Sequence, residues 1–252
     1  TTLFRSNVIG VSNGELKQAL QGLPKLDIIL FDACSMQGIE ILSEIHNFTD
    51  YVIASADEVP VWGFPYESII PILNTHPASI ASQIPNLYTE SYAPGSVYNP
   101  HYDHLVTTCS SIETGRIPEF MTMWKQLSHK MRQKPKELIS LRSTLHEMNT
   151  GYADVDLLQF LKRLSMNENF PEAGSVLSLW EQMIIASSYT LPWIDSDLGT
   201  AAIWFPSVPF SYNSVWKNYM NLEFSKTGWL GVVNLTLGED VIAPEPPILL
   251  QQ

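Results

Sequence analysis

The chain has 252 residues, of which 45% are hydrophobic, and its 26 acidic and 14 basic residues give a formal net charge of −12. This composition excludes a disordered chain, and the negative charge excludes nucleic acid as a partner, because an acidic surface repels phosphates. The same charge favours cationic substrates or simply keeps the protein in solution. No apolar run approaches the roughly 20 residues that span a bilayer, so we expect no membrane span in this chain.

The first third of the chain alternates helical and strand-like segments. A helical pattern over residues 12–20 precedes an apolar run at residues 26–31, which is typical of a strand buried on both faces. We expect a helix directly after Cys34, a second buried strand at residues 51–54 and another helix at residues 66–73. This order predicts a right-handed parallel α/β sheet.

The rest of the chain is mostly helical in pattern. Two further strands are expected at residues 104–112 and 200–205, and the tail from residue 243 is expected to be extended. Helices are expected over residues 78–92, 117–131, 135–148, 152–165, 174–187 and 213–224. The predicted fold class is therefore α/β, with a mainly parallel sheet flanked by helices and a mostly helical C-terminal portion.

Polar and nucleophilic side chains follow the two predicted parallel strands. Asp32 and Cys34 come after the first strand, and Ser55, Asp57 and Glu58 come after the second. Because the carboxyl ends of parallel strands share one edge of a sheet, these residues are expected to lie at the same rim. A cysteine where a strand meets a helix has its thiol near helical N–H groups, which favour the thiolate. The alternative is a buried free cysteine that packs as a small hydrophobic residue, which is the role expected of Cys109.

Several motifs in the right order resemble the clostripain-like cysteine peptidases, relatives of gingipains and caspases. The sequence Asp32-Ala33-Cys34 after an apolar strand, then Met36 and a helix bearing Glu40, looks like the nucleophile motif of that family. The later motifs are similar to its next strand, its Gly-aromatic-Pro-Tyr turn and a late strand ending in an aromatic residue and proline. These are Asp50-Tyr51-Val52-Ile53-Ala54-Ser55, Gly63-Phe64-Pro65-Tyr66 and Ala202-Ile203-Trp204-Phe205-Pro206.

The resemblance implies a caspase-like fold and hydrolysis of peptide bonds through an acyl-enzyme on Cys34. It implies that Asp32 lines a pocket for Arg or Lys before the scissile bond, whereas the alternative for Asp32 is to cap the next helix. Ser55 and Asp57 are expected to line the same pocket, or else to be ordinary polar residues at a strand end. The predicted domains are residues 1–112, the nucleophile-bearing part of the core, and residues 113–252, a helix-rich region packing on it.

The catalytic histidine of that family lies upstream in a His-Gly motif, and this chain has no His-Gly pair and no histidine before His46. Family members are commonly cleaved between His and Cys into associated light and heavy chains. We therefore expect this sequence to be a heavy chain, with the histidine supplied by a light chain as its partner. The resemblance also implies a bacterial protein, secreted or at the cell surface, with lipid anchoring through an upstream part as one route.

Two other functions remain open from the sequence. A catalytically inactive relative that binds peptides or partners is the alternative to a peptidase. A metal site formed by His101 and His104 is disfavoured, because neither a fourth ligand nor an HExxH helix is present. No calcium-binding loop is recognisable, so we expect no cofactor.

Overall fold

A computed structural model describes residues 10–101, 103, 105–148, 153–190, 200–207 and 218–238. The helices are α1 (Glu15–Leu20), α2 (Ile39–Ile45), α3 (Tyr66–Ile69), η1 (Ile70–Ile72), α4 (Pro77–Ser91), α5 (Ile117–Met131), α6 (Pro135–Arg142), α7 (Leu157–Ser165), α8 (Ala173–Met183), η2 (Glu223–Thr227) and α10 (Trp229–Leu237). The strands are β1 (Leu26–Leu30), β2 (Thr49–Ala54), β3 (Thr108–Glu113), β4 (Asp154–Asp156), β5 (Ile184–Tyr189) and β6 (Ala202–Trp204).

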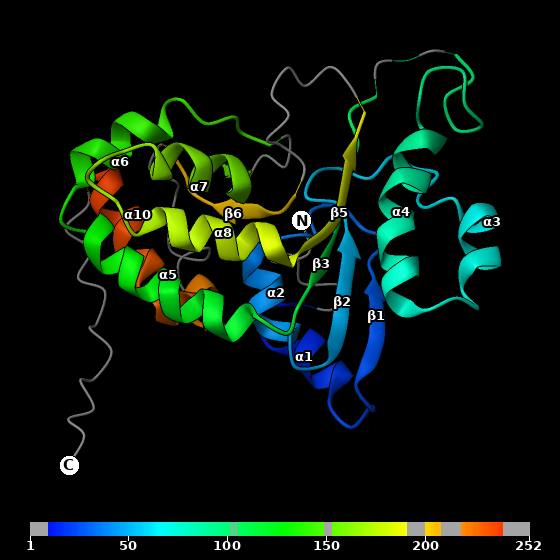
Figure 1. Ribbon diagram of the computed structural model, residues 1–252, viewed down its shortest axis with the longest axis horizontal. Coiled ribbons are helices and arrows are strands. Elements are labelled where there is room, and N and C mark those ends of the chain that lie inside the picture. The colour runs from blue at the N-terminus through cyan, green and yellow to red at the C-terminus, as the bar shows by residue number, and fades with distance from the viewer. Residues whose placement is uncertain are drawn as a thin grey trace.

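The main sheet has the strand order β1-β2-β3-β5 and is flanked by helices on both faces (Figure 1). This arrangement confirms the predicted α/β class. The parallel pairing predicted for the first two strands is confirmed, with Ile28 opposite Tyr51 and Leu30 opposite Ile53. The next two pairs, β2 with β3 and β3 with β5, are antiparallel, so the described sheet is mixed.

Strand β5 accounts for the main difference from the predicted elements. A continuous helix was expected over residues 174–187, but α8 ends at Met183 and β5 begins at Ile184. The β-branched pair Ile184 and Ile185 fits a strand, and pairing with β3 satisfies its backbone hydrogen-bonding groups. Tertiary pairing therefore overrides the helical periodicity of this segment. Residues 213–217 of the helix predicted over residues 213–224, and the predicted extended tail, lie outside the described residues.

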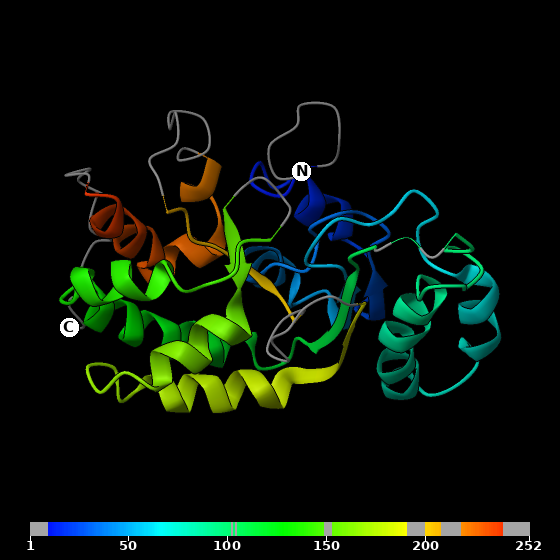
Figure 2. The same ribbon diagram turned by 90° about the horizontal axis from the view of Figure 1, so that it is seen from above.

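The two faces of the sheet pack against different helices. On β2, Val52 and Ala54 face the core that contains α2 and α5, whereas Ile53 faces the core that contains α4. This alternation is the period of two expected of a strand. Figures 1 and 2 show α3 and α4 on one side of the sheet and α2, α5, α8 and α10 on the other. Both faces of the sheet are thus covered by helices.

The helical side has an aromatic core whose stacked rings come from the second predicted domain. Trp124 of α5 stacks on Phe120 at 5.4 Å and meets the ring of Trp229 at 5.5 Å. Strand β5 from the second predicted domain pairs with β3 from the first, and the division at residues 112 and 113 stays a prediction. Among the described residues, no helix combines the length and the hydropathy that a membrane crossing needs.

Candidate active site

Cys34 lies in a turn after β1 and not at the start of a helix. Strand β1 ends at Leu30, and α2 begins only at Ile39. The expectation that a helix follows Cys34 directly, with its N–H groups at the thiol, is therefore wrong. The residues between Cys34 and α2 instead form backbone hydrogen bonds with the segment at the end of β2.

Two backbone hydrogen bonds hold this turn against the end of β2. The Ser35 N–H donates to the Asp57 carbonyl at 3.0 Å, and the Gln37 N–H donates to the Ser55 carbonyl at 2.9 Å. Ser35 has a φ of 58°, a left-handed conformation that is costly for a residue other than glycine. Such a conformation persists only where its surroundings enforce it, so the residue after Cys34 is held in a defined, strained position.

The sulfur of Cys34 is half-buried and faces the backbone of Val59. The Val59 N–H donates to Cys34 Sγ at 3.2 Å, and the thiol lies 3.8 Å from the Val59 carbonyl oxygen. The N–H donor that the sequence predicts at a helix N-terminus is thus provided by Val59, in the loop after β2. Cys34 is a free thiol with partial solvent access.

Asp32 has an exposed side chain and lies beside the turn that follows Val59. The Tyr66 hydroxyl donates to Asp32 Oδ2 at 2.9 Å. Gly63 has a φ of +66°, and a Cβ built on it would lie 2.6 Å from Asp32 Oδ2, closer than real Cβ contacts. Glycine at position 63 therefore permits the carboxylate to approach the backbone. Its carboxylate is open to solvent, and the pocket expected around Asp32 stays a prediction.

Ser55 and Asp57 are both buried, with 0% and 2% of their surface exposed. The Ser55 hydroxyl is 3.1 Å from the Thr108 hydroxyl and 3.0 Å from the Asp57 carbonyl oxygen. Their backbone carbonyls hold the turn that bears Cys34. The predicted contact of these two side chains with substrate stays a prediction, since neither reaches solvent here.

The second cysteine matches the role of a buried thiol. Cys109 on β3 is fully buried and free, and burial raises its pKa far above the ordinary value. Tyr88 of α4 lies within electrostatic reach of Cys109, Cys34 and Asp32, and burial raises its pKa as well. The Tyr88 hydroxyl has no hydrogen-bond partner among the described residues. Cys109 therefore stays neutral, and of the two cysteines only Cys34 has access to solvent.

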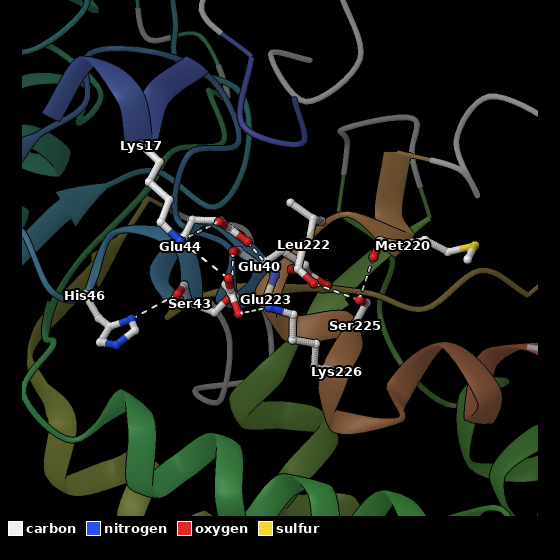
Figure 3. Close-up of polar contacts among 10 residues, drawn as sticks. All are labelled: Lys17, Glu40, Ser43, Glu44, His46, Met220, Leu222, Glu223, Ser225 and Lys226. Atoms are coloured by element: carbon white, nitrogen blue, oxygen red, sulfur yellow. Dashed lines mark hydrogen bonds and ion pairs between the residues drawn. The ribbon is translucent and has the colours of Figure 1, made fainter. Parts of the chain in front are cut away.

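No described histidine contacts the Cys34 sulfur, whose contacts are both with Val59. His46 Nδ1 lies 2.9 Å from the Ser43 carbonyl oxygen, close to the side chains of Glu44 and Glu223 (Figure 3). His76 caps α4, and His129 contacts Gln133. His104 lies outside the described residues. Within the described ranges, no cluster of three or more His, Cys, Asp or Glu side chains could hold a metal ion.

Glu40 connects the first turn of α2 to the C-terminal part of the chain. Its side chain is 4% exposed, and Oε1 accepts hydrogen bonds from the Trp204 N–H at 3.1 Å and the Tyr219 hydroxyl at 2.8 Å. Burial, with a smaller contribution from the Asp154 carboxylate, raises the pKa of Glu40 to about 7. This glutamate fixes α2 and hence the end of the turn that carries Cys34.

The buried Glu40 predicts a pH dependence of stability. Its folded-state pKa of about 7 exceeds the value of 4.5 in an unfolded chain, so the folded state keeps a proton that the unfolded state releases. Its contribution is complete at pH below 4.5 and is lost as the pH rises through about 7. We expect this group to lower the free energy of unfolding by about 2 to 3 kcal/mol between pH 5 and pH 8.

Urea unfolding of the wild type and the Glu40→Gln variant at both pH values tests this expectation. The amide of glutamine still accepts the two hydrogen bonds but cannot titrate, so the variant should lose this part of the pH dependence. Glu181→Gln, at an exposed position of α8, is the matched control and should leave the pH dependence unchanged. Equal pH profiles of the wild type and Glu40→Gln would contradict the assignment.

Two supporting residues could not be found from the sequence. The Val59 N–H is a backbone group that any residue but proline supplies, so it leaves no signal. Gln37 is fully buried, and its amide donates to the Val52 carbonyl at 3.3 Å and to the Ser110 carbonyl at 3.1 Å. A glutamine in a turn gives no sign that it will join two strands.

Comparison with known proteins agrees with this fold. The chain has a TM-score of 0.68 and 18% identity to a B. fragilis cysteine protease, covering 89% of this chain and 95% of that one. It has a TM-score of 0.61 and 17% identity to a clostripain from Bacteroides thetaiotaomicron in complex with the peptide inhibitor BTN-VLTK-AOMK, covering 90% and 96%.

A third similar structure is a secreted C11 cysteine protease from Bacteroides thetaiotaomicron in complex with an irreversible peptide inhibitor. Its TM-score is 0.59 and its identity 21%, with 87% of this chain and 62% of that one covered. At these identities the likeness shows the fold. No curated protein matches the chain.

The family assignment comes from the sequence profile of the clostripain family, which matches residues 5–226. This range includes the turn with Asp32 and Cys34, the buried Glu40 and the late strand β6. The chain belongs to the clostripain family of cysteine peptidases.

Proposed function

We propose that this protein is an endopeptidase that cleaves after Arg or Lys through a thioester on Cys34. The observation that carries the proposal is a half-exposed thiol two residues from an exposed carboxylate. Two residues span at most about 7 Å of chain, so both groups can contact one substrate residue and the bond that follows it. An acidic protein of net charge −12 also attracts cationic substrates.

The reaction follows from the groups around the turn. Cys34 Sγ attacks the scissile carbonyl carbon while its proton passes to a base, and the C–N bond then breaks as that proton moves to the leaving amine. Water hydrolyses the thioester and restores the thiol. The Cys34 N–H has no acceptor among the described residues and is available to the oxyanion. The Val59 N–H donates to the sulfur and holds it at this place in the turn.

The base is proposed to be a histidine on an associated light chain. His46, His76 and His129 have other contacts, and no described histidine forms a hydrogen bond with Cys34. Strand β1 is the last strand on its side of the described sheet, and its apolar residues are only partly buried. A strand added along this edge would satisfy the free edge of β1 and bring residues to the end where Cys34 lies.

Relatives support the choice of substrate and location. The peptide of the inhibitor bound to the Bacteroides thetaiotaomicron clostripain ends in lysine, next to its reactive group. Asp32, held by Tyr66, is the group in this chain that could pair with such a cation. The secreted relative supports an extracellular or cell-surface location, and lipid anchoring stays a prediction.

Mapping the cleavage sites of the full protein in a mixture of unrelated peptides tests this function. We expect cuts on the carboxyl side of Arg and Lys and none after Asp, Glu or neutral residues. Cuts after residues of all kinds would contradict the role of Asp32. Absence of cleavage, with the light chain present, would contradict the peptidase itself.

A further inference from the structure

We infer that the loop from Val59 to Gly63 forms a second subsite, which takes an apolar substrate side chain within two residues of the basic one. This inference rests on the proposed function and goes beyond it, because it assigns a preference that neither Cys34 nor Asp32 provides. The central residue is Trp62, and its neighbours are Val61 and Tyr98.

Both ends of this loop are fixed at groups of the candidate active site. At one end the Val59 N–H donates to Cys34 Sγ at 3.2 Å. At the other end Gly63 lies against the Asp32 carboxylate, whose oxygens come within 2.7 Å of a Cβ built on it. Three residues span at most about 11 Å, so Trp62 must lie close to both the sulfur and the carboxylate.

The loop exposes its apolar side chains instead of burying them. Val61 is 94% exposed and Trp62 is 67% exposed, and Val97 nearby in the Tyr98 loop is 71% exposed. Large apolar groups gathered on a surface and rimmed by polar residues mark a binding site. The rim here includes Asp32 and Glu67.

Aromatic contacts make this surface rigid. The Trp62 ring stacks on Tyr98, with ring centroids 6.3 Å apart and an interplanar angle of 21°. Tyr98 packs on the buried Tyr92 at 5.4 Å, and its hydroxyl donates to Glu67 Oε2 at 3.0 Å. The Tyr92 hydroxyl in turn donates to the Gly63 carbonyl at 2.7 Å. This bond connects the tyrosines beneath Trp62 to the end of its loop. A preformed apolar surface loses little conformational entropy when a side chain binds to it.

Other surfaces fit these observations less well. A pocket of about 450 Å³ is lined by Lys125, His129, Lys130, Arg132 and Lys226, but only its charge points to a ligand. The Trp62 loop combines exposed apolar side chains, the neighbouring carboxylate of Asp32 and direct contact with the candidate nucleophile. A peptide that places a basic residue at Asp32 must pass beside this loop, which identifies the occupant as substrate.

Paired peptides that differ only by Leu or Asn, two side chains of similar size, test the subsite. Each peptide carries one Arg, with the variable residue placed one or two positions before or after it. We expect kcat/KM of the wild type to favour Leu by about tenfold in at least one position, and Trp62→Ala to reduce this ratio to about twofold or less. Trp62 is mostly exposed, so its replacement should leave the fold intact.

One control variant should keep the preference for Leu. Met166→Ala removes a side chain that is 81% exposed just after α7, on other elements. A ratio near one at every position, or a ratio unchanged by Trp62→Ala, would overturn the subsite while cleavage after Arg continued to support the peptidase.

A binding measurement separates the two proposals. The Cys34→Ala variant of the full protein is titrated calorimetrically with the same peptide pairs. If no peptide is cleaved by the wild type, the peptidase proposal fails, and the ratio of dissociation constants decides the subsite alone. Equal dissociation constants for Leu and Asn peptides would then reject it, and a preference for Leu that Trp62→Ala abolishes would support it.

Discussion

Replacing Cys34 by alanine is expected to lower kcat for peptide hydrolysis by about 10⁴-fold or more. The sulfur forms the covalent intermediate, and the other cysteine of the chain is fully buried on β3. The half-buried position of Cys34 indicates that alanine is tolerated without loss of the fold. Steady-state kinetics on a peptide with one Arg, together with thermal unfolding of both proteins, provides the measurement.

The matched control for this replacement is Cys109→Ala. This variant removes the other thiol of the chain from a site that burial keeps neutral. It should keep kcat within about threefold of the wild type and lower stability by about 1 kcal/mol. Loss of hydrolysis in Cys109→Ala with retention in Cys34→Ala would reverse the assignment of the nucleophile.

Replacing Asp32 by asparagine is expected to lower kcat/KM for Arg and Lys peptides by about 100-fold. The carboxylate is exposed in the free protein, but a bound peptide would exclude water and strengthen its attraction for the cation. Asparagine keeps an oxygen for the Tyr66 hydroxyl, so the loss should reflect charge. A peptide with citrulline, the neutral analogue of Arg, should be cleaved equally by both proteins.

Two further variants test whether the effect comes from the charge of Asp32 itself or from the overall negative charge of the protein. Asp27→Asn, at an exposed position of β1, removes one negative charge from the strand that precedes Asp32. It should change kcat/KM by less than about threefold. Gly63→Ala keeps the Asp32 carboxylate but places a methyl group against its oxygens, so an intermediate loss is expected. Equal losses in Asp27→Asn and Asp32→Asn would indicate long-range steering only.

The parts of the fold that the sequence predicts are those governed by local periodicity. Helix α5 occupies residues 117–131 as expected from its apolar spacing, and β1 and β2 lie where short apolar runs predict buried strands. The strand character of residues 184–189 was missed, because a helical pattern continues into it from α8. Only its pairing with β3, a contact between distant parts of the chain, identifies it as β5.

The candidate site was predictable in its residues and less so in its geometry. Asp32 and Cys34 lie at the end of β1, as the Asp-x-Cys spacing after an apolar strand indicates. The strained backbone of Ser35 and the burial of Asp57 depend on how the turn meets β2, which no local pattern encodes. The exposure of Trp62 beside Asp32 emerges only when Gly63 is placed against that carboxylate.

Covalent labelling tests the central claim most directly. The full protein is treated with an irreversible peptidyl electrophile that ends in Lys, and with the same compound ending in Glu, and peptide mass spectrometry locates the adduct. We predict one adduct on Cys34, formed at least about 100-fold faster with the Lys compound. An unmodified Cys34 with the light chain present, or equal rates for the two compounds, would contradict a thiol that acts beside a carboxylate selective for basic residues.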